Sequence, residues 1–368
     1  MASDSETGQL GHDRRTTYEK WTAEEGLPVI QGFYVADLKK LELSPWKRRG
    51  GLGAYINLEG AGGTNDAYVA EILPGSSLKP EKYMFEELIY VLSGRGATTI
   101  WNEGGKKQTF EWQAGSLFSP PLNVWRQHFN GQGDQPARFL AVTTAPMVMD
   151  LYHSLEFVFN NPFVFRERYA GEDDYFSGNG KTFVGPVAKN IWQSNFIPDV
   201  AAFRLTEWKE RGAGGANVMF ELADNSLAAH VSEFPVGTYK KAHRHGPGAH
   251  VVILGGEGYS LLWEGEQPKT RVDWHAGSMF VPPDMWFHQH FNVGAAPARY
   301  LALRWGSQKF RMGGVFKRAS APETAISTRI GGNQIEYEDE DPEVRRIFEH
   351  ELAARNVDSR MAQFFTQN

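Results

Sequence analysis

Two pairs of histidines in the second half of the chain have the spacing of metal ligands. The first pair is His243 and His245, and the second pair, His288 and His290, begins 43 residues after His245. In a β-strand, residues i and i+2 point to the same side, so each pair would present two imidazoles to one face. Two such strands can surround one divalent ion with three or four nitrogens, and neutral imidazole suits Fe, Mn, Ni, Cu or Zn. This pattern favours a metal site over buried structural histidines.

The framework that carries these histidines occurs twice in the chain. A shift of 162 residues places residues 33–130 on residues 195–292 without a gap. For example, Trp112 and Gly115 fall on Trp274 and Gly277. A solenoid repeat has a period of roughly 20–50 residues, so this longer period indicates a duplicated domain.

The first repeat has lost the residues that would bind a metal. Four positions of the second repeat, His243, His245, Ala249 and His288, are matched in the first by other residue types: Glu81, Tyr83, Glu87 and Arg126. Only His128 is kept, opposite His290. One glutamate and one histidine make a poor metal site, and Arg126 would repel a cation. We therefore predict that the first repeat binds no metal and is either structural or a partner that shapes the pocket or a dimer interface.

Each repeat consists of short alternating apolar and polar runs, which glycine and proline interrupt every ~8–12 residues. Many short strands around one core predict an all-β fold of two tandem barrels or jelly rolls. We expect a flexible arm (1–30), a first barrel (31–145), a partly helical linker (146–191), a second barrel (192–306) and an extension (307–368). In the extension, Asp341 and Pro342 predict the start of a C-terminal helix that runs to about Arg355. Its apolar positions include Val344, Phe348 and Leu352.

The composition excludes several classes of protein. The net charge of −6 does not favour nucleic acid or an anionic membrane surface as a partner. No apolar run approaches the ~18 residues of a membrane span, and no secretory signal is evident, so we expect a cytoplasmic protein. The absence of cysteine excludes thiolate ligands and disulfides. Because the arm and the extension lack a core of their own, we also expect a homo-oligomer.

The spacing of glycines and histidines resembles the cupin superfamily. Four residues of the second repeat match the first cupin motif: Gly237, His243, His245 and Gly256. Four more match the second motif: Gly277, Pro283, His288 and Asn292. Because both repeats fit the pattern, the whole chain resembles a bicupin. The resemblance implies two cupin barrels, with a metal bound inside the second by His243, His245 and His288.

The second repeat departs from the cupin pattern at one ligand position. A typical cupin has a glutamate where this chain has Ala249, so the usual carboxylate ligand is missing. His250 is the neighbouring residue, and strand parity places it on the opposite face from Ala249. A one-residue bulge would turn His250 inward. His250 is therefore a candidate fourth ligand or pocket residue, with an outward or core position as the alternative.

A three-histidine site without the glutamate resembles gentisate-type ring-cleaving dioxygenases. That resemblance implies Fe(II) and a small-molecule substrate, with His290 as a supporting base or hydrogen-bond partner. Arg304, which follows Tyr300 in phase on the last strand, could pair with a substrate carboxylate through two hydrogen bonds. A surface ion pair is the alternative role for Arg304. Gentisate-type enzymes keep their metal in the first cupin, which differs from the expectation here.

Three functions follow from these observations. The leading hypothesis is a non-haem Fe(II) dioxygenase that acts on a small aromatic or enolic acid. The second is a redox-silent isomerase, decarboxylase or hydrolase that uses Mn, Ni or Zn. The third is a metal-stabilised binding or accessory protein without catalytic activity.

Overall fold

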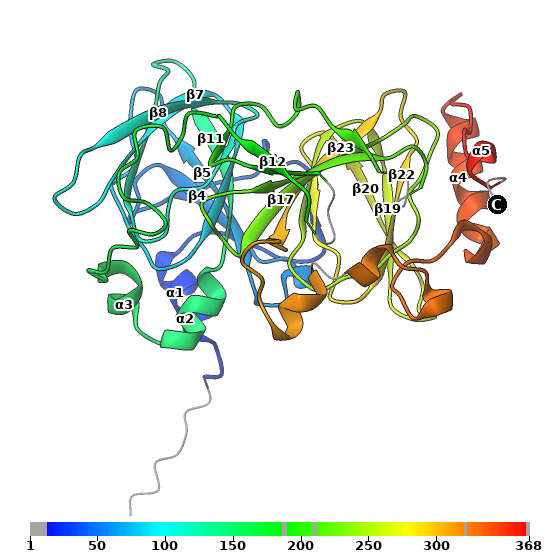
Figure 1. The fold of residues 1–368 in the computed structure, drawn as a ribbon, viewed down its shortest axis with the longest axis horizontal. Coiled ribbons are helices and arrows are strands. Elements are labelled where there is room, and N and C mark those ends of the chain that lie inside the picture. Colours follow the sequence, from blue (N-terminus) through cyan, green and yellow to red (C-terminus); the bar gives the residue numbers. More distant parts are fainter. Residues whose placement is uncertain (1–12, 186–189, 209–211, 320–321, 366–368) are drawn as a thin grey trace, which may run out of the picture.

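The chain folds into two β domains that lie side by side, with helices at the outside (Figure 1). The computed structural model describes residues 13–185, 190–208, 212–319 and 322–365. The eight strands of the first domain are β4 (Leu52–Ile56), β5 (Asp66–Ile72), β6 (Glu87–Ser93), β7 (Arg95–Trp101), β8 (Gln108–Gln113), β9 (Leu117–Phe118), β10 (Trp125–Asn130) and β11 (Ala137–Thr143). Their counterparts in the second are β16 (Ala216–Glu221), β17 (Leu227–Phe234), β18 (His250–Gly255), β19 (Glu257–Trp263), β20 (Thr270–His275), β21 (Met279–Phe280), β22 (Phe287–Asn292) and β23 (Ala298–Trp305).

Both domains have the strand order of a jelly roll. In the first domain, one sheet contains the order β5-β11-β6-β9, and the second sheet has the order β10-β7-β8. The segment from Ser77 to Glu81 extends the second sheet, because it forms bridges with β10. The second domain repeats this arrangement as β17-β23-β18-β21 and β20-β19-β22, with the segment from Tyr239 to His243 beside β22. The predicted all-β fold of two tandem jelly rolls is therefore confirmed.

The two domains exchange short strands. β2 (Tyr34–Val35), which precedes the first domain, pairs with β21 of the second, while β14 (Phe196–Ile197) pairs with β9 of the first. The exchange is symmetric in detail, because Leu38 N–H donates to the Gly277 carbonyl and Val200 N–H donates to the Gly115 carbonyl, both at 2.9 Å. Both glycines have a left-handed φ, +100° at Gly277 and +90° at Gly115, which a residue with a Cβ adopts only under strain.

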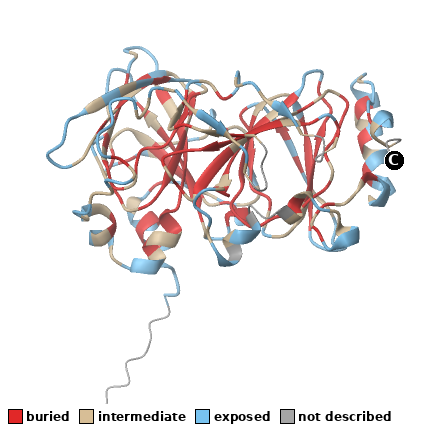
Figure 2. Ribbon diagram, in the orientation of Figure 1, coloured by how far each residue is buried: buried red, intermediate tan, exposed pale blue. Residues whose placement is uncertain are grey.

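A shared apolar core lies between the domains. It contains Val69 and Leu140 of the first domain together with Val231, Leu301 and Leu303 of the second. Figure 2 shows the buried strands that meet at the centre of the molecule.

The remaining short strands are β1 (Val29–Ile30), β3 (Ser44–Pro45), β12 (Lys181–Phe183), β13 (Ile191–Gln193) and β15 (Thr206–Glu207). The domain boundaries expected from the sequence stay a prediction. They did not include the exchange of β2 and β14 between the domains.

Helices cover the ends of both domains. They are α1 (Thr17–Glu25), α2 (Ala145–Tyr152), α3 (Leu155–Asn160), α4 (Pro342–Ala354) and α5 (Ala362–Phe365). Short 3₁₀ turns add η1 (Glu59–Ala61), η3 (Gly314–Ala319), η4 (Pro322–Ala325), η5 (Thr328–Ile330) and η6 (Tyr337–Asp339). The C-terminal helix is present as predicted, with Val344, Phe348 and Leu352 buried against the outer face of β19 and β22. None of the helices in the described ranges is long and apolar enough to cross a membrane.

The described part of the predicted flexible arm is ordered instead. Residues 1–12 lie outside the described residues, but residues 13–30 contain α1, which begins with a capping box between Thr16 and Glu19. Tyr18 and Trp21 on this helix are buried in the core of the first domain. These buried aromatic side chains fasten the described part of the arm to the first domain.

Candidate metal centre

The two strand segments that carry the histidines lie next to each other. His243 and His288 face each other in an antiparallel bridge, with N–H···O distances of 3.0 and 2.8 Å in the two directions. Residues opposite each other in an antiparallel pair have their side chains on the same face. His245 follows His243 by two residues and therefore shares this face.

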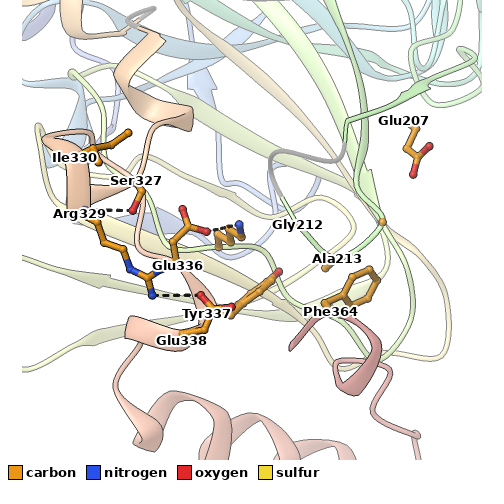
Figure 3. Close-up of a pocket in the computed structure, with 12 residues that line it drawn as sticks. Glu207, Gly212, Ala213, Ser327, Arg329, Ile330, Glu336, Tyr337, Glu338 and Phe364 are labelled. Carbon is orange, nitrogen blue, oxygen red and sulfur yellow. Dashed lines mark hydrogen bonds and ion pairs between the residues drawn. The ribbon is translucent and has the colours of Figure 1, made fainter. Parts of the chain in front are cut away.

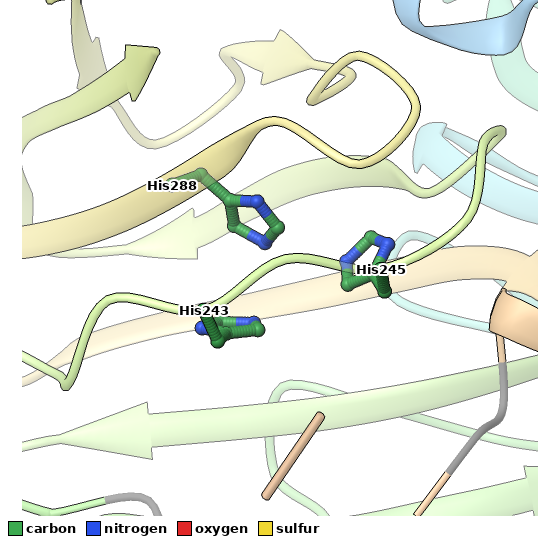
Figure 4. A group of neighbouring side chains, drawn as sticks. All are labelled: His243, His245 and His288. Carbon is green, nitrogen blue, oxygen red and sulfur yellow. The ribbon is translucent and has the colours of Figure 1, made fainter. Parts of the chain in front are cut away.

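The structure brings three of the predicted ligands together (Figure 4). One ring nitrogen from each of His243, His245 and His288 lies within 4.8 Å of the others. The three side chains are 6%, 8% and 1% exposed, so water contributes little to their solvation. In the part of the chain that the structure describes, this is the one group of three or more histidine, aspartate or glutamate side chains with metal-binding spacing.

Backbone carbonyls orient all three rings. Nδ1 lies 3.3 Å from the Lys241 carbonyl in His243, 2.8 Å from the Gly246 carbonyl in His245, and 3.2 Å from the Trp286 carbonyl in His288. A carbonyl oxygen only accepts, so these contacts place the proton of a neutral ring on Nδ1 and its lone pair on Nε2. Metal-bound histidines commonly have such a carbonyl partner, which fixes the tautomer and the ring orientation. The donor set of neutral imidazoles therefore fits a divalent first-row metal ion.

His290 lies beside this group. Its ring centroid is 5.6 Å from that of His288 and 6.3 Å from that of His243. Its Nδ1 lies 2.8 Å from Ser260 Oγ, which accepts a hydrogen bond from the Trp274 indole at 3.0 Å.

The first domain contains the same relay. His128 Nδ1 lies 2.8 Å from Thr98 Oγ1, which accepts from the Trp112 indole at 2.9 Å. Burial, followed by the charges of Arg49 and Arg126, lowers the pKa of His128 well below its usual range. Because the relay is present in both domains, the hydroxyl contact of His290 is a property of the fold. The predicted supporting role of His290 depends on its position next to His288.

Arg304 faces the interior of the second domain. On β23 it points to the same face as Tyr300 and Ala302, which belong to the apolar cluster inside this jelly roll. The half-buried Arg304 therefore lies on the same side of the sheet as the metal-binding group, and its role in substrate binding or in an ion pair stays a prediction.

His250 is not part of the three-histidine group, and the hypothesis that it is a fourth ligand is not supported by its strand position. His250 is paired with Leu303, while the next pair, Val251 and Ala302, points into the second domain. Strand alternation thus places His250 with Val252 on the face toward the first domain. The bulge in β18 occurs after Ile253, too late to turn His250 inward.

Burial of His250 has a chemical consequence. Its side chain is fully buried, and its Nε2 has no hydrogen-bond partner among the described residues. Burial lowers its pKa to about 4, although the Gly248 carbonyl acts in the opposite direction. His250 is therefore a neutral core histidine.

A buried polar layer of Lys240, Ser232 and Tyr300 lies behind His290 and was not predicted from the sequence. Lys240 is 3% exposed, and its ammonium donates to Ser232 Oγ at 2.8 Å and to the Tyr300 hydroxyl at 3.2 Å. The Tyr300 ring also contacts the ring of His290, with 5.5 Å between centroids. A signal was present in the repeat, because the equivalent residues of the first domain are all apolar: Leu78, Ala70 and Phe139.

The positions that the three metal-binding histidines have in the second domain carry ion pairs in the first. Arg126 lies 3.5 Å from Glu87 and 4.0 Å from the centroid of the Tyr83 ring, and Tyr83 donates to Glu87 at 2.6 Å. Glu81 pairs with Arg49 and, at 2.9 Å, with Arg48. Burial opposes ionisation of Glu81, but the neighbouring arginines outweigh it and lower its pKa. A guanidinium group thus lies where the second domain has the His288 ring.

The chain matches no protein-family model and no curated protein. Among solved structures, it is similar to variants of Bacillus subtilis oxalate decarboxylase OxdC. One variant is 14% identical with a TM-score of 0.48, and another is 14% identical with a TM-score of 0.49; each match covers 75% of this chain and 78% of that chain. A further structure, described for its Mn(II) centres, is 15% identical with a TM-score of 0.48 over the same shares.

The architecture of the chain itself can be set beside the expectation from its sequence. Two jelly rolls in tandem, related by a repeat of 162 residues, enclose one three-histidine group in the second domain. Two tandem jelly rolls with this histidine group in the second are the arrangement that the resemblance to bicupins implies.

Proposed function

We propose that this bicupin is a metal-dependent enzyme that converts a small carboxylic or enolic acid inside its second domain. The observation that carries the proposal is the buried group of His243, His245 and His288, which presents three neutral nitrogens without a carboxylate. A divalent ion held by these rings would retain its full positive charge and would polarise an oxygen of the acid as a Lewis acid.

The interior side chains supply the remaining functions. Arg304 can bind a substrate carboxylate through two parallel hydrogen bonds, because its guanidinium presents donors in a fixed fork. His290 and Tyr300 can each hold a proton within the same interior. Lys240 donates to the Tyr300 hydroxyl at 3.2 Å and would stabilise negative charge on that oxygen.

This set of proton-holding groups favours redox-silent chemistry over oxygenation. In a decarboxylation, a C–C bond breaks to release carbon dioxide, and the electron pair that remains must take up a proton to form a C–H bond. An isomerisation likewise moves a proton between carbon atoms. His290 and Tyr300 can each provide such a proton, so we favour a decarboxylase or isomerase that uses Mn, Ni or Zn.

Fe(II)-dependent dioxygenation is the second candidate. The observation that favours it is Ala249, which leaves a three-histidine site where a typical cupin has a fourth, carboxylate ligand. Three protein ligands leave open positions for both a bidentate acid and dioxygen.

The two candidates differ in their need for oxygen. The protein would be stripped of metal, reloaded anaerobically with Mn(II) or Fe(II), and supplied with hydroxybenzoates, enolic acids and oxalate. Our proposal predicts carbon dioxide release or isomer formation without oxygen, and a loss of activity in the matched variant His288→Ala. Oxygen uptake with Fe(II) alone would instead favour the dioxygenase. Metal binding without turnover across the panel would favour the accessory protein.

A further inference from the structure

The segment that carries His243 and His245 is held on both of its sides. On one side it pairs with β22, as described above. On the other side it pairs with the C-terminal extension, because Arg244 N–H donates to the Asn333 carbonyl at 3.0 Å and Ile335 N–H donates to the Ala242 carbonyl at 2.9 Å. Gln334 forms an antiparallel bridge with His243 itself. Residues 333–335, which we call the clamp, therefore pair with residues 242–244, which include the metal-binding His243 and end next to His245.

The side chain between the two histidines fastens this arrangement. Arg244 Nε donates to Asn333 Oδ1 at 2.9 Å, and its guanidinium lies 4.7 Å from the centroid of the Phe287 ring. Phe287 directly precedes His288, so Arg244 links the clamp to both segments that carry metal-binding histidines. In the first domain, Lys82 lies over Trp125 at the equivalent positions. The cation–π contact is thus common to both domains, and Asn333 is an addition in the second.

The extension borders a cavity directly beyond the clamp. Glu336 forms an ion pair with Lys241, whose carbonyl orients the ring of His243. Next to this pair lies a cavity of about 520 Å³, which Tyr337 and Arg329 also line (Figure 3). None of the three metal-binding histidines lines this cavity. The backbone hydrogen bonds of residues 333–335 and the bond from Arg244 to Asn333 therefore hold the clamp against the metal-binding segment.

We infer that the clamp is a positioning element for the metal. It holds residues 242–244 extended, and only an extended backbone points His243 and His245 to the same side. Metal binding and docking of the clamp are therefore coupled, and by linkage each stabilises the other to the same extent. This inference rests on the metal site of the proposed function but not on the reaction.

The test compares the variants Asn333→Ala and Asn333→Asp in the full chain. Loss of one hydrogen bond of about 0.5–1.5 kcal/mol corresponds to roughly a 2- to 12-fold weaker affinity. We expect Asn333→Ala to weaken Mn(II) binding by this factor and to change the visible spectrum of the Co(II)-loaded protein, which reports ligand geometry. Asn333→Asp keeps the acceptor for Arg244 and should restore both. Hydrogen exchange of residues 323–340 should slow when Mn(II) binds.

Arg329→Ala is the matched control, because Arg329 lies in the same extension and pairs with Asp339 at the surface. It should leave Mn(II) affinity and the Co(II) spectrum unchanged. If Asn333→Ala binds Mn(II) like the wild type, and exchange of residues 323–340 does not respond to metal, the inference is wrong. If the wild type itself binds no Mn(II), Co(II) or Fe(II), the proposed function fails as well.

Discussion

The two domains have the same strand order, but at equivalent interior positions one has side chains that suit a cation and the other has a cationic side chain. In the second domain, the ring nitrogens of His243, His245 and His288 lie close together and have the spacing of ligands for a cation. In the first, Arg126 provides a cation of its own and pairs with Glu87. The comparison shows that a buried ion pair in the first domain occupies the place of the proposed metal site in the second.

The comparison also separates residues that belong to the fold from residues that belong to the site. The relay of tryptophan, hydroxyl and histidine is present in both domains and is therefore part of the fold. The layer of Lys240, Ser232 and Tyr300 is polar only in the domain that carries the three histidines. Substitutions that exchange residues between the domains test this division.

The largest expected effect comes from His288→Ala. Removal of one of three ligands should weaken metal binding by more than the roughly 10- to 100-fold that loss of a supporting partner costs. Calorimetric titration with Mn(II) measures the affinity, and His128→Ala, at the position equivalent to His290 in the first domain, is the control. Metal binding of equal strength in His288→Ala would contradict the assignment of this ligand.

Arg126→Ala should act on stability alone. It would leave Glu87, which is fully buried, without its counter-charge, and breaking a buried pair in this way costs about 3–5 kcal/mol. Urea unfolding would measure the loss, and metal content per folded chain should not change. A variant as stable as the wild type would show that the Tyr68 and Tyr83 hydroxyls, which also donate to Glu87, suffice.

His250→Leu should remove a pH dependence of stability. The pKa of His250 is about 4 in the folded chain and about 6.5 when exposed, so between these values the unfolded chain binds more protons. The contribution of neutral His250 to the free energy of unfolding is therefore fully present above pH 6.5. It is lost as the pH falls toward 4, by up to about 3 kcal/mol. Leucine copies Leu88 at the equivalent position of the first domain, so the variant should lose less stability between pH 7 and 4.5. An unchanged slope would contradict a neutral, buried His250.

The smallest effect is expected from Lys240→Leu, which copies Leu78 of the first domain. Metal affinity should change little, because Lys240 contacts Ser232 and Tyr300 and is not one of the three metal-binding residues. Loss of the hydrogen bond to Tyr300, worth about 1.4 kcal/mol, should lower kcat roughly tenfold. Steady-state kinetics of the Mn(II)-loaded enzyme would measure it. An unchanged kcat would show that the layer of Lys240, Ser232 and Tyr300 has no part in the proposed reaction.

Much of this architecture could be predicted from the sequence. The repeat and the spacing of His243, His245 and His288 indicated the fold and the metal-binding group, because strand alternation is a local property. The position of His250 depended on where β18 has its bulge, which spacing does not reveal. The exchange of β2 and β14, the burial of Lys240 and the clamp at Asn333 involve residues far apart in the sequence, so no local pattern announces them.

The most direct test of the account is the number and position of metal ions in the full chain. Mn(II)-loaded protein would be examined by elemental analysis and by anomalous diffraction at the manganese edge. We predict one ion per chain, within bonding distance of Nε2 of His243, His245 and His288, and no ion near Arg126. An ion in the first domain, or a second domain that stays empty at saturating Mn(II), Fe(II) and Zn(II), would contradict the account.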